Sequence, residues 1–124
     1  MNIKNLLLNN EIVKPNQVWS ADFTYLPSNN KNHKFIFLAT VIDYYTREII
    51  GFELSVKHNV SLVINALFDV IKTRKNKKSE IFHVDQGSEY SSHEFINILE
   101  SLKIKPSFSN KASKQIGNLP QFSI

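Results

Sequence analysis

The hydrophobic periodicity of this chain changes once, after residue 54, and that change constrains the fold more than any other feature. Along residues 17–26 every second residue is Trp, Ala, Phe or Tyr, which is typical of a strand with one face in a core. Residues 35–42 are almost continuously apolar and predict a central strand, and residues 48–54 return after a short link. The first half therefore predicts three antiparallel strands in a meander.

Beyond residue 54 the apolar residues recur at spacings of three and four, which indicates an amphipathic helix over residues 60–71. A short strand is predicted over residues 80–84, a second helix after a capping box at residues 91–94, and an edge strand over residues 105–109. The order of strands and helices indicates an α/β domain with a mixed sheet. The stripe of the first helix consists of Val60, Val63, Ile64, Leu67, Phe68 and Ile71.

The 124 residues fit one domain, with a linker or arm over residues 1–16, a core over residues 17–109, and a divergent tail over residues 110–124. A hydrophobic content of 42% is enough for a buried core, and the absence of cysteine excludes disulfides and thiolate metal sites. The sequence shows neither a signal peptide nor an apolar run that could span a membrane. We therefore expect a soluble, cytoplasmic protein.

The net charge of +4 is unevenly distributed. One basic group lies within seven residues at the end of the first predicted helix, and a looser group lies between residues 103 and 114. Such groups suit the phosphate backbone of DNA, although lysines are also common at solvated helix ends. The first group consists of Lys72, Arg74, Lys75, Lys77 and Lys78, and the second of Lys103, Lys105, Lys111 and Lys114.

Two aspartates are the candidates for metal chemistry. Asp22 lies near the end of the first predicted strand, on the face away from Trp19 and Phe23, and Asp85 ends the strand at residues 80–84. Carboxylates brought together in this way bind divalent metal, and divalent metal is a common means of cutting or joining phosphodiesters. Each aspartate, taken alone, could instead be a surface residue or a turn cap.

Three tracts of the chain resemble the catalytic core of insertion-sequence transposases of the retroviral-integrase type, which carry two catalytic aspartates and one glutamate. The tracts are Pro-Asn-Gln-Val-Trp-Ser-Ala-Asp-Phe-Thr-Tyr at residues 15–25, Val-Ile-Asp-Tyr-Tyr-Thr-Arg at residues 41–47, and His-Val-Asp-Gln-Gly-Ser-Glu-Tyr at residues 83–90. The resemblance covers residues 14 to 113. It implies a ribonuclease-H-like fold in which the first and fourth strands are adjacent.

The resemblance also implies catalytic and metal-binding roles for Asp22 and Asp85, with Mg²⁺ or Mn²⁺ as cofactor. In the family, two ions activate the attacking water or 3′-hydroxyl and stabilise the leaving oxygen. The third carboxylate is expected about 36 positions after Asp85 on a final helix, where this chain has Gln121 next to Pro120. We therefore expect the final catalytic helix to be missing and metal to bind weakly.

Other residues of these tracts have two interpretations each. Asp43 suits turn chemistry better than catalysis, and His83 could orient DNA or the metal shell, or be a packed strand histidine. Glu89 is a remote substitute for the third carboxylate, and Trp19 is expected in the core. The resemblance implies that Gly87 and Tyr90 shape a mobile loop beside the site and that Lys111 and Lys114 flank the DNA path.

The function implied is that of a transposase core for DNA integration and transposition, by metal-dependent phosphodiester cleavage and strand transfer. Family members usually carry a helix-turn-helix region upstream, so the chain resembles a truncated central fragment that is expected to be inactive as it stands. The alternative is a non-catalytic fragment that binds DNA, or that interferes with transposase. The expected partners are DNA and, in the alternative, full-length transposase or a second copy of the chain.

Overall fold

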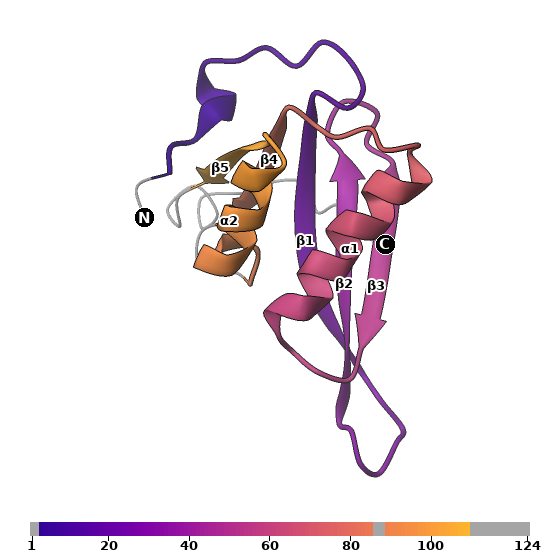
Figure 1. The fold of residues 1–124 in the computed structure, drawn as a ribbon. Helices are drawn as coiled ribbons and strands as arrows, with labels where there is room; N and C mark the ends of the chain where they lie inside the picture. Colours follow the sequence, from indigo (N-terminus) through magenta and orange to yellow (C-terminus); the bar gives the residue numbers. More distant parts are fainter. Residues whose placement is uncertain (1–2, 86–88, 110–124) are drawn as a thin grey trace.

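The computed structural model describes residues 3–85 and 89–109 as one five-stranded sheet with two α-helices (Figure 1). The strand order is β3-β2-β1-β4-β5. The predicted α/β class and the predicted element order are confirmed, with boundaries within about two residues of those expected. The elements are η1 (Leu6–Leu8), β1 (Val18–Pro27), β2 (Phe35–Asp43), β3 (Ile49–Ser55), α1 (Val60–Thr73), β4 (Ile81–Asp85), η2 (Glu89–Ser91), α2 (His93–Ser101) and β5 (Lys105–Ser109).

The sheet is mixed, and its two halves are built differently. Strands β1, β2 and β3 form the predicted antiparallel meander. Strand β4 runs parallel to β1, and β5 runs parallel to β4. The predicted adjacency of the first and fourth strands is therefore confirmed. Parallel pairing requires a crossover, and α1 supplies the one between β3 and β4.

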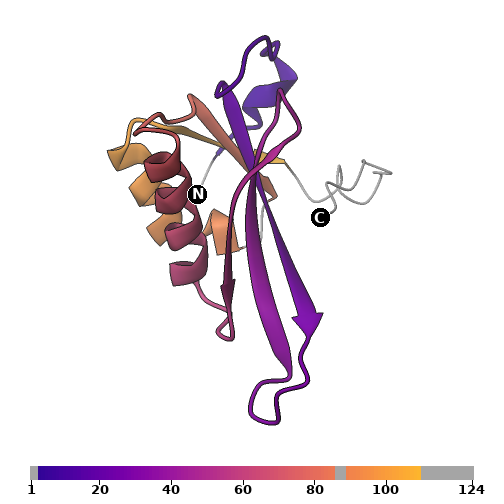
Figure 2. The ribbon, with the colours of Figure 1, turned by 90° about the vertical axis from the view of Figure 1, so that its right-hand side faces the viewer.

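Both helices cover the same face of the sheet (Figure 2). Within the described residues the opposite face carries no helix. Strands β1 and β2 are long, and the hairpin that joins them extends well past the helices (Figure 1). The helix-free face of the sheet and the far end of the hairpin therefore have no helix of the described residues over them.

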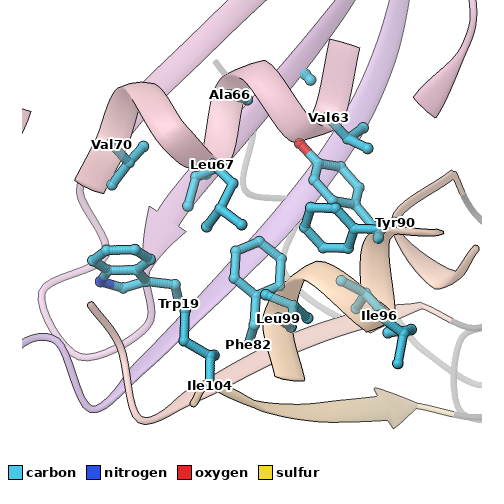
Figure 3. Packing of buried hydrophobic residues seen from close by; sticks show 14 of the residues in the cluster. Trp19, Val63, Ala66, Leu67, Val70, Phe82, Tyr90, Ile96, Leu99 and Ile104 are labelled. Atoms are coloured by element: carbon cyan, nitrogen blue, oxygen red, sulfur yellow. The ribbon is translucent and has the colours of Figure 1, made fainter. Parts of the chain in front are cut away.

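The core fills the layer between the helices and the sheet. Trp19 is fully buried, as predicted, and packs in one cluster with Val63 and Val70 of α1 (Figure 3). Phe82 lies 5.3 Å from Phe95 between ring centroids, in an edge-to-face arrangement that favours aromatic packing. These contacts bury the apolar stripes of both helices.

The predicted stripe of α1 is wrong at one position, because Phe68 remains 45% exposed. Leu62, Ala66 and Val70 are buried instead, so the buried stripe is rotated relative to the one predicted. Gly51 explains how closely α1 approaches the sheet: a Cβ added there would overlap Val70. The missing side chain on β3 thus lets the helix lie directly on the strand.

The helix ends explain two further details. Ser92 is the N-cap of α2, and its side chain accepts a hydrogen bond from the Phe95 N–H at 3.2 Å, so the helix begins one residue later than a capping box from residue 91 requires. At the end of α1, Lys75 and Asn76 have positive φ angles of 57° and 64°. This left-handed turn lets the Asn76 N–H donate to the Ile71 carbonyl at 2.8 Å.

The N-terminal segment contacts the sheet, which the prediction of a linker or arm over residues 1–16 did not anticipate. The Leu6 N–H donates to Ser107 Oγ at 2.8 Å, and the Phe108 N–H donates to the Lys4 carbonyl at 3.1 Å. The segment therefore lies beside β5. Among the helices of the described residues, none is long and apolar enough to cross a membrane.

Candidate metal centre

The parallel pairing of β1 with β4 brings the two candidate aspartates onto neighbouring strands. In the register, Trp19 lies opposite Phe82 and Ser20 opposite His83. Asp22 and Asp85 each follow two residues later, on strands that run in the same direction. Because paired strands lie about 4.8 Å apart, two aspartates with 62 residues between them in the sequence lie on adjacent strands, just past the end of the parallel ladder.

Both aspartates lie on the helix-free face. Trp19, Ala21 and Phe23 belong to or pack against the core cluster beneath the helices. Side chains alternate along a strand, so Asp22 faces the other side, as the sequence predicted. Phe82 and Val84 are buried in the same core, which puts His83 and Asp85 on the face of Asp22.

Asp22 is partly accessible and weakly held. Its Oδ1 accepts a hydrogen bond from the Phe23 N–H at 2.8 Å. Its backbone carbonyl accepts a 3.5 Å contact from the buried Thr40 hydroxyl on β2. Half-burial without a cationic partner among the described residues is an arrangement in which a carboxylate can accept a metal ion.

Strand β5 adds two hydroxyl groups that the sequence analysis did not select. The register aligns His83 with Ser107 and Asp85 with Ser109. Ser109 Oγ donates to Asp85 Oδ1 at 2.7 Å, and Ser107 Oγ shares a 2.7 Å hydrogen bond with His83 Nδ1. Both serines occupy alternate positions of a short strand, and this period-two pattern is the signal that could have identified them.

His83 is uncharged at neutral pH. Burial of the ring lowers the pKa of His83 to about 4, and the negative charge of Asp85 only partly opposes that shift. The imidazole therefore brings no positive charge against the carboxylates. The hydrogen bond to Ser107 fits the packed strand histidine of the two interpretations offered above, although the ring also lies beside Asp85.

Tyr90 lies in the core, and the mobile loop that the resemblance implies beside the site stays a prediction. Tyr90 is 1% exposed and belongs to the core cluster. Its hydroxyl donates to the Thr40 carbonyl at 3.3 Å. Burial raises the pKa of Tyr90, and the nearby charge of Asp22 raises it further. Tyr90 thus anchors the strand that lies next to Asp22.

Asp43 is the last residue of β2 and belongs to a separate polar cluster, in which its side chain is shielded from solvent. Its side chain is fully buried and accepts hydrogen bonds from the backbone N–H groups of Asn16, Tyr45 and Thr46 at 2.9, 3.0 and 3.3 Å. Its Oδ2 lies 3.8 Å from the Arg74 guanidinium. These contacts support the turn interpretation of Asp43.

The basic group Lys72–Lys78 lies away from the aspartates. It joins α1 to the start of β4, whereas Asp85 ends that strand, about 13 Å farther along. Arg74 differs from its neighbours because it is half-buried, and it donates to Asn16 Oδ1 at 2.8 Å. The exposed side chains are those of Lys72, Lys75, Lys77 and Lys78.

Several other residues that the sequence analysis selected lie in parts of the chain that the structure does not describe. Gly87, Lys111, Lys114 and Gln121 lie outside the described residues, as does the side chain of Glu89. Within residues 3–85 and 89–109, no group of three or more His, Cys, Asp and Glu side chains could hold a metal ion. Asp22 and Asp85 are therefore two candidate carboxylates without a third beside them among these residues.

Comparison with known proteins agrees with this geometry. Residues 13–114 match the family model described as the integrase core domain. The chain is 32% identical over 99 residues to the "Insertion element IS600 uncharacterized 31 kDa protein" of Shigella sonnei, covering 80% of this chain and 35% of the relative. It is 33% identical over 97 residues to the transposase InsF for insertion sequence IS3A of Escherichia coli K12, covering 78% and 33%.

A solved structure shares the fold. The HTLV-2 integrase catalytic core domain, solved in complex with magnesium in a dimeric form, superposes with a TM-score of 0.64 over 82% of this chain and 66% of that one, at 22% identity. The predicted ribonuclease-H-like, integrase-type fold is confirmed by this likeness. The chain spans about a third of the length of the curated relatives that it matches.

Proposed function

Because the chain belongs to the integrase core domain family, we propose that it carries the two-aspartate part of a metal-dependent site for cutting and joining DNA. The observation that supports this proposal is the parallel pairing of β1 with β4, which puts Asp22 and Asp85 on adjacent strands and on the helix-free face of the sheet. The transposase relatives support DNA as the substrate and transposition as the reaction. The cytoplasm is the compartment that this substrate implies.

Asp22 and Asp85 each have one carboxylate oxygen held by a hydrogen bond, and carboxylate oxygens suit metal binding. Oxygen ligands of this kind are the ones Mg²⁺ and Mn²⁺ prefer. The Ser109 hydroxyl orients one oxygen of Asp85, and the Phe23 N–H orients one oxygen of Asp22. A bound divalent ion would supply Lewis acidity for activating the attacking oxygen and stabilising the leaving one. Uncharged His83 leaves the negative potential of the site intact.

A site with two carboxylates binds divalent metal more weakly than a site with three. The described residues hold no third acidic ligand, and the third negative charge is what stabilises a second divalent ion at short range. We therefore expect this chain to bind one ion weakly and to cleave DNA slowly or not at all. Self-association, which the dimeric form of the HTLV-2 core illustrates for that protein, belongs to the same proposal.

The decisive experiment is a Mn²⁺ titration followed by electron paramagnetic resonance, run beside a nicking assay on supercoiled DNA. We expect Asp22→Asn and Asp85→Asn each to weaken Mn²⁺ binding at least tenfold and to remove any nicking. Glu48→Gln is the matched control, because it removes the same charge from an exposed turn residue. Equal Mn²⁺ affinity in all four proteins would refute the two-aspartate site.

A second candidate function is DNA binding without catalysis. It is favoured by the four exposed lysines between α1 and β4, which lie apart from the aspartates. Lys75→Gln with Lys77→Gln should then weaken duplex DNA binding and reduce its salt dependence, while Asp22→Asn leaves that affinity unchanged. Loss of DNA affinity in the Asp22→Asn protein would contradict this second function.

A further inference from the structure

The β1–β2 hairpin carries a strip of aromatic side chains that runs from the edge of the core toward the far end of the hairpin, and we call it the aromatic strip. Phe23 and Tyr25 come from β1, Phe35 and Phe37 from β2, and His58 from the segment after β3. The β1–β2 register pairs Phe23 with Ala39 and Tyr25 with Phe37, so the rings of both strands share one face. This hairpin projects from the body of the domain (Figure 1).

The rings of the strip contact one another in sequence. The His58 ring stacks on Phe23 and on Phe37, with centroids 4.7 and 4.8 Å apart. Tyr25 meets Phe35 edge to face at 5.0 Å and lies 6.4 Å from Phe37. The result is a ladder of flat π-faces that begins beside α1 and ends in solvent.

Exposure distinguishes the outer part of the strip from ordinary core. Tyr25 is 61% exposed and His58 is exposed, while the three phenylalanines are half-buried. Cross-strand aromatic pairs stabilise a hairpin, and burial of the rings adds to that stabilisation. Tyr25 is too open to gain much in that way. Its outer face is available to a further flat ring.

The charges at the far end of the β1–β2 hairpin are of one sign, whereas Glu53 on β3 shares the same face of the sheet. Residues 23–37 contain Lys31, His33 and Lys34 but no aspartate or glutamate. The Lys34 ammonium lies 5.8 Å from the centroid of the Phe35 ring, and Lys57 is exposed next to His58. Aromatic faces interleaved with lysines are the combination by which proteins bind unpaired nucleotides, the bases stacking while the phosphates meet the cations.

We propose that the aromatic strip binds single-stranded DNA, with a base stacked on Tyr25 and the adjoining phosphates near Lys31, Lys34 and Lys57. Strand β1 thus carries Asp22 facing one side of the sheet and Phe23 and Tyr25 facing the other. The choice of DNA over RNA rests on the function proposed above, but the binding itself needs neither metal nor Asp22. The two proposals can therefore fail separately.

The test is fluorescence anisotropy of a labelled fifteen-nucleotide oligo(dT) with the full chain in EDTA. We expect the protein to bind it more tightly than the matched duplex. Tyr25→Thr, which keeps a residue that favours strands, should weaken single-strand binding by about tenfold. Tyr45→Thr is the matched control, because Tyr45 is 49% exposed in the turn at the opposite end of β2.

A charge test stands beside the ring test in case Tyr25→Thr fails to fold by circular dichroism. Lys31→Gln with Lys57→Gln should lower the slope of log affinity against log salt by about 1.4, whereas Lys4→Gln with Lys14→Gln, at exposed residues of the N-terminal segment, should leave it unchanged. Single-strand affinity within twofold of wild type in folded Tyr25→Thr, or equal slopes in both lysine pairs, would overturn the proposal. Tighter binding of the matching RNA would overturn the choice of DNA.

Discussion

Asp43 and Asp22 belong to the same antiparallel strand pair, yet their surroundings are opposite. Asp43 lies opposite Trp19 at one end of the pair, fully buried, with three backbone donors and a guanidinium around it. Asp22 lies three residues farther along β1, half-exposed, and accepts a hydrogen bond from its neighbour's N–H. A buried carboxylate whose oxygens all have donors holds a fold together, whereas an open one retains capacity for a ligand.

The contrast predicts that Asp43 is the more important of the two for stability. Asp43→Ala leaves three partly buried N–H groups and Arg74 without the carboxylate, so we expect a loss of about 3 kcal/mol in the free energy of unfolding. Urea denaturation followed by circular dichroism measures it. Asp22→Ala should cost less than about 1 kcal/mol. If the two substitutions cost the same, the distinction between a structural and a ligand-binding aspartate fails.

Arg74, the cationic partner of Asp43, provides a second test of the difference between the buried and the exposed charged residues. It is one member of a run of basic residues, but its guanidinium is tied to Asn16 at 2.8 Å. We expect Arg74→Gln to lower the free energy of unfolding by about 1.5 kcal/mol, against about 0.5 kcal/mol or less for the exposed Lys77→Gln. The same urea experiment compares them. An equal or larger loss of unfolding free energy in Lys77→Gln would contradict the inference that Arg74 stabilises the polar cluster around Asp43.

These examples indicate what the sequence could predict. Periodicity is a local property, so the strands and helices followed from it within about two residues. The proximity of the Asp22 and Asp85 strands came from the resemblance, because strand pairing between positions with 62 residues between them leaves no local trace. The role of Arg74 could not be predicted, since a run of five basic residues does not say which one turns inward to a partner 58 positions away.

Several residues at the candidate site also could not be predicted from the sequence, because their contacts depend on strand pairing. Ser107 and Ser109 resemble ordinary polar residues of an edge strand until the register aligns them with His83 and Asp85. The burial of Tyr90 was not predicted, because a short motif does not show that this side chain packs into the core. The aromatic strip requires two strands and a distant histidine, so the sequence order alone conceals it.

The effect of metal on stability should also distinguish Asp22 from Asp43, because only Asp22 is proposed to bind metal. The expected difference is smaller than in the two urea experiments. A ligand that binds only the folded state raises stability, by about 1.4 kcal/mol at ten times its dissociation constant. We expect Mn²⁺ at such a concentration to raise the thermal unfolding midpoint of the wild-type protein but not that of Asp22→Asn. Scanning calorimetry with and without EDTA measures it. A rise that persists in Asp22→Asn would locate the bound ion elsewhere.

His83 gives the smallest expected effect, on the order of 1 kcal/mol once its partial access to solvent is allowed for. Its pKa falls from an ordinary 6.5 to about 4 on folding, so between these values the unfolded chain binds a proton that the folded chain does not. Stability should therefore decrease as the pH falls from about 6.5 to about 4. Nuclear magnetic resonance of the His83 ring gives the pKa directly, and urea denaturation of His83→Gln should show a flatter pH profile. A ring that titrates near 6.5 would mean that the imidazole is solvated, and His83 would then be able to bring a positive charge beside Asp85 at mildly acidic pH.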